Sequence, residues 1–168
     1  MQQVLTQFAD TLSAQREVHM ELLSLSEQKK DAITKNDVPS LDRIVKGEEV
    51  LLSRLNQWEH KRRECVRELA GQVGRPVGEV VLRDFLPLCD TDQRERLETL
   101  HTELTSLLKR QIAVNDINKR LIESRLEYIN YSLETASDAG QSAFHTYGEE
   151  GREFGRPERK TSFIDQKV

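Results

Sequence analysis

The sequence predicts an all-α protein, a long antiparallel helical bundle or coiled coil of three main helices with a disordered C-terminal tail. Apolar residues recur at three-, four- and seven-residue steps through most of residues 1–136. Of the 168 residues only eight are glycine and four are proline, and most of these fall in a mid-chain loop and the tail. A mean hydropathy of −0.65, with 32% charged residues, is typical of long exposed helices.

The first helix is expected over about residues 3–35. Gln15 and His19 interrupt its apolar stripe, so its packing should be looser there. The pattern then breaks, and Asp37 or Ser40 is expected to cap the next helix. The apolar stripe consists of Leu5, Phe8, Leu12, Val18, Leu22, Leu25 and Ile33.

The second helix, over about residues 39–70, carries the cleanest stripe of the chain. Gly71 and Gly74 can adopt the left-handed conformation that ends helices. A rise of about 1.5 Å per residue makes this helix roughly 45–50 Å long, and helices of that length pair with others. Its stripe consists of Leu41, Ile44, Val45, Leu51, Leu52, Leu55, Trp58, Cys65, Val66 and Leu69.

A connection rich in glycine and proline follows at residues 71–90. It is expected to hold a short helix, and Asp90 with Gln93 is placed to form a capping box for the third main helix. The apolar residues expected to face inward from this connection are Val80, Val81, Phe85 and Leu86.

The third helix is expected from about Asp92 to about Ala136, with apolar residues at heptad spacing. Beyond it, residues 137–168 have no sustained period and are expected to form a flexible polar tail. The predicted domains are therefore a helical bundle over residues 1–136 and a tail over 137–168. The inward positions of the third helix are Leu97, Leu100, Leu104, Leu107, Gln111, Val114, Asn118, Leu121, Arg125, Tyr128 and Ser132.

Charge and composition restrict the function. A net charge of −4 argues against a nucleic-acid binder that neutralises phosphates. No window approaches the ~18 consecutive apolar residues of a membrane span, and the N-terminal residues lack the pattern of a signal peptide. Cys65 and Cys89 give no disulfide framework and are expected to be small buried groups. We expect a cytoplasmic protein without membrane insertion.

No arrangement of residues supports catalysis. The histidines, His19, His60, His101 and His145, form no HxxxH, HExxH or ExxH pattern. The glycines of residues 71–78 lack the GK[ST] ending of a phosphate-binding loop, and no Gly-x-Ser-x-Gly elbow occurs. The sequence therefore predicts neither an enzyme nor a metal or cofactor site.

The basic run His60-Lys61-Arg62-Arg63 is interleaved with glutamates. Acidic and basic residues three and four apart on a helix form ion pairs on a solvated face. The alternative is a docking face for an acidic partner.

The C-terminal part of the third helix is apolar over more than half of its circumference. A helix in a three-helix bundle that is apolar nearly all round must bury a second face. The chain's own tail, a second subunit and a client helix are the candidates, with Phe163 and Ile164 as a plug from the tail. The apolar residues of this face are Leu121, Ile122, Leu126, Tyr128, Ile129 and Leu133.

Two asparagines, Asn115 and Asn118, lie one turn apart just before this face. An inward asparagine costs stability in a helical bundle but fixes the register of the helices, because it needs a matching partner. The same side chains could instead bond an incoming helix. Both interpretations stay open at the level of sequence.

The run NDINKRLI at residues 115–122, preceded by leucines at heptad spacing, resembles the FlgN family of flagellar type III export chaperones. Three further stretches fit the resemblance. WEHKR at 58–62 is similar to the family's acidic–x–x–arginine signature, LSAQREVHMELLSLSEQ at 12–28 to its leucine- and glutamate-rich opening, and SFIDQKV at 162–168 to tails of Gram-positive-type members. The resemblance covers residues 1–135 and, more loosely, the tail.

The resemblance implies a cytoplasmic chaperone for hook-associated proteins, which form the junction between flagellar hook and filament. It implies that the chaperone binds C-terminal helices of these clients, prevents their premature assembly and delivers them to the export gate and its ATPase complex. It also implies that clients dock on the C-terminal part of the chaperone, which matches the apolar end of the third helix. We therefore expect the client-binding residues to be Asn115, Asn118, Leu121, Ile122, Leu126, Tyr128, Ile129 and Leu133. The alternative is a structural coiled-coil adaptor, a homodimer that acts by self-association without a secretion client.

Overall fold

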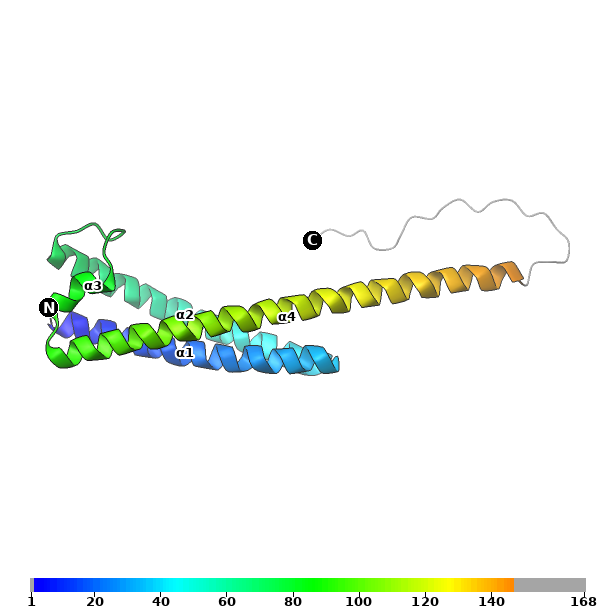
Figure 1. The fold of residues 1–168 in the computed structure, drawn as a ribbon, viewed down its shortest axis with the longest axis horizontal. Helices are drawn as coiled ribbons and strands as arrows, with labels where there is room; N and C mark the ends of the chain where they lie inside the picture. The colour runs from blue at the N-terminus through cyan, green and yellow to red at the C-terminus, as the bar shows by residue number, and fades with distance from the viewer. Residues whose placement is uncertain (1, 147–168) are drawn as a thin grey trace. The chain divides into compact units, whose positions relative to one another are not determined.

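A computed structural model describes the backbone of residues 2–146 and the side chains of residues 2–137. Within this range the chain is helical, without strands. The expected plug residues Phe163 and Ile164 lie outside the described residues. The elements are α1 (Gln2–Lys35), α2 (Val38–Val73), α3 (Leu82–Phe85), the 3-10 turn η1 (Leu86–Leu88) and α4 (Thr91–Thr146) (Figure 1).

The chain divides into two compact units, Met1–Leu126 and Glu127–Val168. The first unit holds α1, α2, α3, η1 and the part of α4 before residue 127. In the second unit α4 continues to Thr146, past the end expected near Ala136. No proline occurs between residues 91 and 146, and the single glycine there costs a helix only about 1 kcal/mol.

Helices α1 and α2 form an antiparallel pair, as the polar contacts between them show. Gln15 bonds Glu59, Arg54 bonds Glu21 and Lys29 pairs with Glu48. The sequence separation of these pairs falls from 44 to 33 to 19 toward the turn at Asn36. Such a steady fall is the mark of two helices running in opposite directions.

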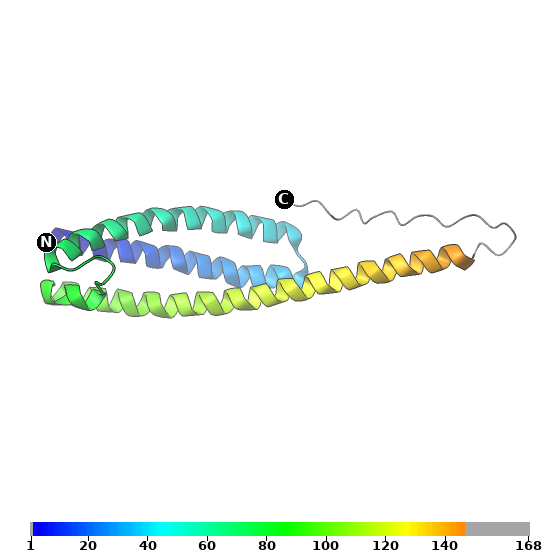
Figure 2. The same cartoon turned by 90° about the horizontal axis from the view of Figure 1, so that it is seen from above.

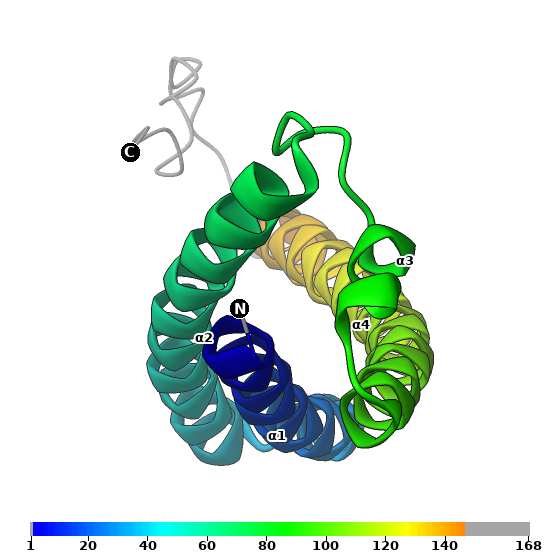
Figure 3. The ribbon, with the colours of Figure 1, turned by 90° about the vertical axis from the view of Figure 1, so that its left-hand side faces the viewer.

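In the first unit α4 runs in the same direction as α1. The sequence separation of its contacts with α1 stays between 83 and 92, from Arg96 with Asp10 at one end to Arg125 with Thr34 at the other. Figures 2 and 3 show α2 and this part of α4 on either side of α1. The directions of the three helices agree with an antiparallel up-and-down arrangement, in which the first and third helices run parallel; among the described residues, hydrogen bonds join α1 to α2 and α1 to α4.

The helix ends follow from local sequence. Asp37 is the N-cap of α2, and its carboxylate accepts a hydrogen bond from the Ser40 backbone N–H at 3.1 Å. Gly74 ends α2 with φ of 72°, a left-handed conformation that glycine adopts without steric cost. Before α4, the Gln93 N–H donates to Asp90 Oδ1 at 2.8 Å, as the capping box predicts.

The main apolar core lies at the end of the first unit where α1 begins and α2 ends. Phe85 from α3 is 2% exposed, and its ring meets that of Phe8 edge-on with centroids 6.1 Å apart. Val81, expected to face inward, is half exposed, because it precedes α3 as its N-cap. The other buried members of this core are Val4, Leu5, Ala9, Leu12, Cys65, Leu69, Leu97 and Leu100.

A smaller core between α1 and α2 takes over toward the middle of the hairpin. It is built on Val18, Leu22 and Leu51, with Leu25, Leu55 and Trp58 packed around it, and α4 contributes none of these residues. Val45 and Leu52, expected in the inward stripe of α2, are 40% and 50% exposed. The apolar face of α2 is thus wider than the α1 surface that covers it.

Candidate functional site

The apolar residues predicted at the C-terminal part of α4 are mostly exposed. In the first unit, Leu121 is half-buried, whereas Ile122 and Leu126 are 39% and 54% exposed. In the second unit, Tyr128, Ile129 and Leu133 are between 47% and 67% exposed. Large apolar groups so open to water lower the free energy of the chain when a partner covers them.

Tyr131 was missed by the sequence analysis, although it is 68% exposed and lies among these residues in the second unit. It falls three residues after Tyr128, which is the spacing of side chains on one helix face. This spacing from Tyr128 is the feature of the sequence that could have identified Tyr131. Tyrosine is enriched at protein interfaces because its ring buries a large apolar area while its hydroxyl stays hydrogen-bonded.

Asn118 is the buried polar residue of α4 in the first unit. It is 3% exposed, and its Nδ2 donates a hydrogen bond of 2.7 Å to the backbone oxygen of Ser26 on α1. Its Oδ1 has no hydrogen-bond partner among the described residues. Asn118 therefore faces α1, whereas Asn115, one turn earlier, is exposed.

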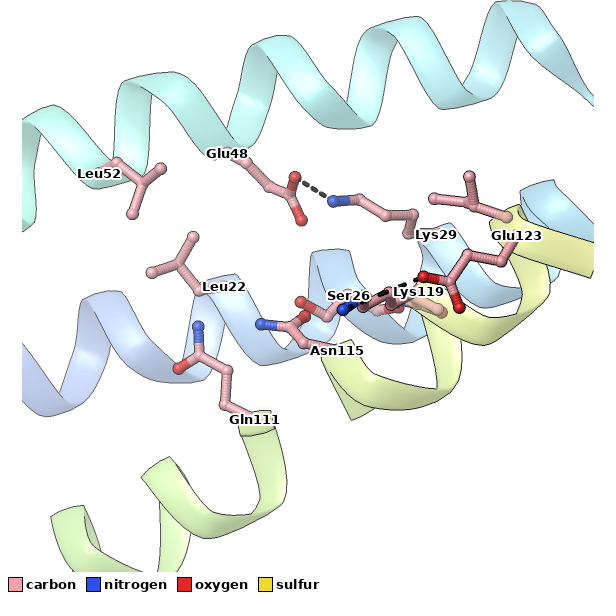
Figure 4. Close-up of a pocket in the computed structure, with 11 residues that line it drawn as sticks. Leu22, Ser26, Lys29, Glu48, Leu52, Gln111, Asn115, Lys119 and Glu123 are labelled. Atoms are coloured by element: carbon pink, nitrogen blue, oxygen red, sulfur yellow. Dashed lines mark hydrogen bonds and ion pairs between the residues drawn. The ribbon is translucent and has the colours of Figure 1, made fainter. Parts of the chain in front are cut away.

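Asn115 lines a groove of about 490 Å³ in the first unit, where α1, α2 and α4 meet (Figure 4). We refer to it as the amide groove, after the three amide side chains that α4 places along it. Two ion pairs, Lys29 with Glu48 and Lys119 with Glu123, lie in its wall. The lining residues are Leu22, Ser26, Lys29, Glu48, Leu52, Gln111, Asn115, Asn118, Lys119, Ile122 and Glu123.

Most of the polar residues that interrupt the predicted stripes make contacts between helices in the first unit. Gln15 is buried and donates to Glu59 at 3.2 Å. His19 Nδ1 donates to Gln111 Oε1 at 2.9 Å, and Arg125 donates to the Thr34 backbone oxygen at 2.6 Å. Together with the bond from Asn118, these contacts form what we call the polar seam of the first unit.

Glu59 directly precedes the basic run on α2 and forms ion pairs with two of its arginines. It accepts hydrogen bonds from Arg62 at 2.7 Å and from Arg63 at 2.8 Å. The Arg62 guanidinium is the main cause that lowers the pKa of Glu59 to about 2. Lys61 lies over the Trp58 ring, 4.2 Å from its centroid. The basic charges near Glu59 are thus largely taken up by contacts within α2.

The described residues show no grouping suited to a metal, and the thiols are not activated. No cluster of three or more metal-ligating side chains occurs within them. Burial raises the pKa of the Cys65 and Cys89 thiols above their ordinary value, which disfavours the reactive thiolate. Across the part of the chain that the structure describes, no helix is both long and apolar enough to cross a membrane.

Long helices, a polar seam and exposed apolar residues on α4 define a helical protein suited to binding other helices. A family model described as "FlgN protein" matches residues 1–153, and the chain therefore belongs to the FlgN family. This family suggests the role of a flagellar export chaperone and is not known for enzymes.

Among curated proteins, the chain is similar to "Uncharacterized protein YvyG" of Bacillus subtilis (strain 168). The two are 25% identical over 117 residues, which cover 70% of this chain and 71% of the relative. No solved structure matches the chain.

Proposed function

We propose that the protein is a cytoplasmic chaperone that binds the C-terminal helices of hook-associated proteins, prevents their premature assembly and delivers them to the export gate and its ATPase complex. The observation that carries this proposal is the exposure of large apolar side chains on α4. Tyr128, Ile129, Tyr131 and Leu133 are each about half or more exposed in the second unit, and Leu126 is so in the first.

The physical chemistry of the client favours this role. The terminal amphipathic helix of a client is unstable alone, because its apolar face has no partner and short helices are marginal in water. An exposed apolar helix face of the chaperone can supply that partner. An affinity of about −8 to −10 kcal/mol, near micromolar, would hold the client and still permit its release.

Calorimetric titration of the full chain with C-terminal peptides of its organism's hook-associated proteins tests the proposal. We expect saturable one-to-one binding, and a loss of affinity of at least tenfold on Leu126→Asp or Ile129→Asp. A buried charge opposite an apolar client face would cause this loss. Met20→Asp, at an exposed apolar residue of α1, is the matched control and should change the affinity by less than twofold.

Circular dichroism of each variant separates binding from folding. An Ile129→Asp chain that keeps its helicity and loses the peptide supports the proposal. A chain that loses its helicity on this substitution would place Ile129 in a folding core and contradict it. Peptides that bind neither the parent chain nor the variants would also contradict it.

In this role we infer that Asn118 sets the register of α1 against α4 and that Asn115 is free to meet a partner. The inference is supported by the 2.7 Å bond from Asn118 to the Ser26 backbone and by the exposure of Asn115. Sliding α4 by one turn along α1 would bury the Asn118 amide without that bond, at a cost of about 1–3 kcal/mol.

Phe163 and Ile164 remain a prediction as a plug that competes with the client. In the full chain, Phe163→Ser with Ile164→Ser should then raise the affinity for client peptides. An unchanged affinity would exclude such competition.

The second candidate is a coiled-coil adaptor that acts by self-association. It is favoured by the same exposed residues of α4, which a second copy of the chain could cover. Sedimentation equilibrium decides between the two. A stable dimer that Ile129→Asp converts to a monomer, and that does not bind client peptides, would support the adaptor.

A further inference from the structure

The amide groove shares Ile122 with the exposed apolar face of α4, but its other lining residues lie elsewhere and most of them are polar. None of the hydrogen bonds or ion pairs among the described residues joins α2 to α4, and the core beneath the groove belongs to α1 and α2 alone. The surface of α1 between them, marked by Leu22 and Ser26, therefore forms the floor of the groove. Figure 4 shows the side chains of Leu22 on α1 and Leu52 on α2 pointing toward one another.

The groove is elongated along the helices. Its wall on α4 extends from Gln111 to Glu123, which at 1.5 Å per residue is about 18 Å. A groove of this length between two helices, above a third, has the shape that a fourth helix fills in a four-helix bundle. Two exposed apolar side chains lie at the rim of the groove, Leu52 on α2 and Ile122 on α4, and an incoming helix would cover them.

Three of the polar lining residues are amide side chains of α4. Gln111, Asn115 and Asn118 lie at steps of four and three residues, so they share one face of α4. Gln111 uses its oxygen for His19, and Asn118 uses its nitrogen for Ser26. Asn115 makes no hydrogen bond within the described part of the chain, and Asn118 Oδ1 is buried without a partner there.

The amide groups of Asn115 and Asn118 that lack a hydrogen-bond partner indicate which kind of side chain a bound helix must carry. A purely apolar helix would cover Asn115 and leave its donors and acceptor unsatisfied, at a cost of about 1–3 kcal/mol. A glutamine or asparagine on the occupant can both donate to and accept from such an amide. The charges of the groove give no preference for an acidic or a basic partner, because Lys29 pairs with Glu48 and Lys119 with Glu123.

We propose that the amide groove binds an amphipathic helix whose apolar stripe is interrupted by one glutamine or asparagine, with that amide bonded to Asn115. The occupant completes a four-helix bundle with α1, α2 and the first-unit part of α4. In the chaperone role the occupant is a segment of the client, and to that extent the inference rests on the proposed function. Its contact residues are separate from Ile129 and Leu133.

The test uses the full chain and two synthetic helical peptides of about 21 residues. Both carry a leucine stripe on a Lys/Glu/Ala background, and they differ only in a central glutamine or leucine. We expect the glutamine peptide to bind, and Asn115→Ala to weaken it about fivefold, the equivalent of one hydrogen bond of about 1 kcal/mol. The leucine peptide should instead bind the Asn115→Ala variant about fivefold more tightly or better, because the substitution removes the amide that this peptide leaves unsatisfied.

A blocking variant and a matched control locate the binding. Asn115→Trp, at an exposed position, should abolish binding of both peptides without unfolding the chain, as thermal denaturation will verify. Ser106→Trp is the control, because Ser106 lines a different hollow of the first unit together with Arg16 and Met20. It should leave binding unchanged. Equal losses from both tryptophans, or none from Asn115→Trp, would overturn the inference.

Parallel titrations with client peptides separate this inference from the chaperone proposal. Client peptides that respond to Ile129→Asp but not to Asn115→Trp would overturn the groove and support the chaperone. Synthetic peptides that respond to Asn115, with client peptides that do not bind, would support the groove and overturn the chaperone. A peptide of residues 147–168 that binds with the same dependence on Asn115 would make the tail the occupant and overturn the inference. A dimer that Asn115→Trp dissociates would do so too, because the occupant would then be a second copy.

Discussion

The two ends of the first unit are held together by different chemistry. Where α1 begins, side chains from α1, α2, α3 and α4 share one apolar core, closed by Phe85. Toward the α1–α2 turn, α4 contributes none of the residues of the smaller core, and hydrogen bonds of the polar seam from Asn118 and Arg125 hold it to α1. The apolar end is built for stability, and the polar end leaves helix surface open for a partner.

This difference has an energetic reason. A buried leucine or phenylalanine contributes about 1.5–3 kcal/mol without regard to direction, whereas a hydrogen bond contributes about 1 kcal/mol and only in one geometry. The polar seam therefore fixes the position of α4 on α1 while adding little stability. Four substitutions, from the largest expected effect to the smallest, test the comparison.

Phe85→Ala should cost about 3–4 kcal/mol of the free energy of unfolding, because it leaves a cavity in the apolar end. Urea denaturation followed by circular dichroism measures this. Val81→Ala, four residues earlier and half exposed, is the control and should cost less than about 0.5 kcal/mol. Similar costs for the two would mean that α3 does not close the core.

Asn118→Leu should stabilise the chain by about 1–2 kcal/mol, because it replaces a buried amide whose Oδ1 has no partner with an apolar side chain. Thermal denaturation gives the stability, and sedimentation the oligomeric state, which should change if register is lost. Unchanged stability combined with lost client affinity would assign Asn118 to direct contact instead.

Glu59→Gln should cost on the order of 1 kcal/mol at neutral pH, since it removes a charge bonded to Arg62 and Arg63 at a partly exposed site. The folded pKa of Glu59, about 2, lies below its ordinary value of 4.5. The stabilisation is therefore present above pH 4.5 and lost as the pH falls toward 2. A stability difference between parent and variant that persists at pH 2 would contradict this origin.

Asp42→Asn should change the free energy of unfolding by less than about 0.5 kcal/mol, because its partner Lys46 and the carboxylate itself are mostly exposed. Chemical denaturation in low and high salt checks it. A larger loss of the free energy of unfolding, if high salt removes it, would show that this exposed ion pair stabilises α2 more than expected.

The sequence predicted the features that depend on local residue patterns, namely the helices and their caps. The apolar period predicted where the three long helices begin and where the first two end, but not that α4 continues to Thr146. Of the expected caps, Asp37 rather than Ser40 begins α2, Gly74 rather than Gly71 ends it, and Asp90 bonds the Gln93 N–H before α4. The period also placed Phe85 inward but put Val81 beside it, since a four-residue helix is too short for a period to decide. It could not show that Val45 and Leu52 stay exposed, because that depends on how far α4 lies from α2.

By itself, the sequence determined that this chain is helical, where its main helices begin, and which family it resembles, because helix periodicity and capping are local. Only the tertiary structure decided that Asn118 is buried while Asn115 lines a groove, and that Gln15, His19 and Arg125 join helices. These features arise from contacts between residues up to 92 positions apart. The register that brings such residues together depends on how the helices pack against one another, so the sequence of a single helix does not determine it.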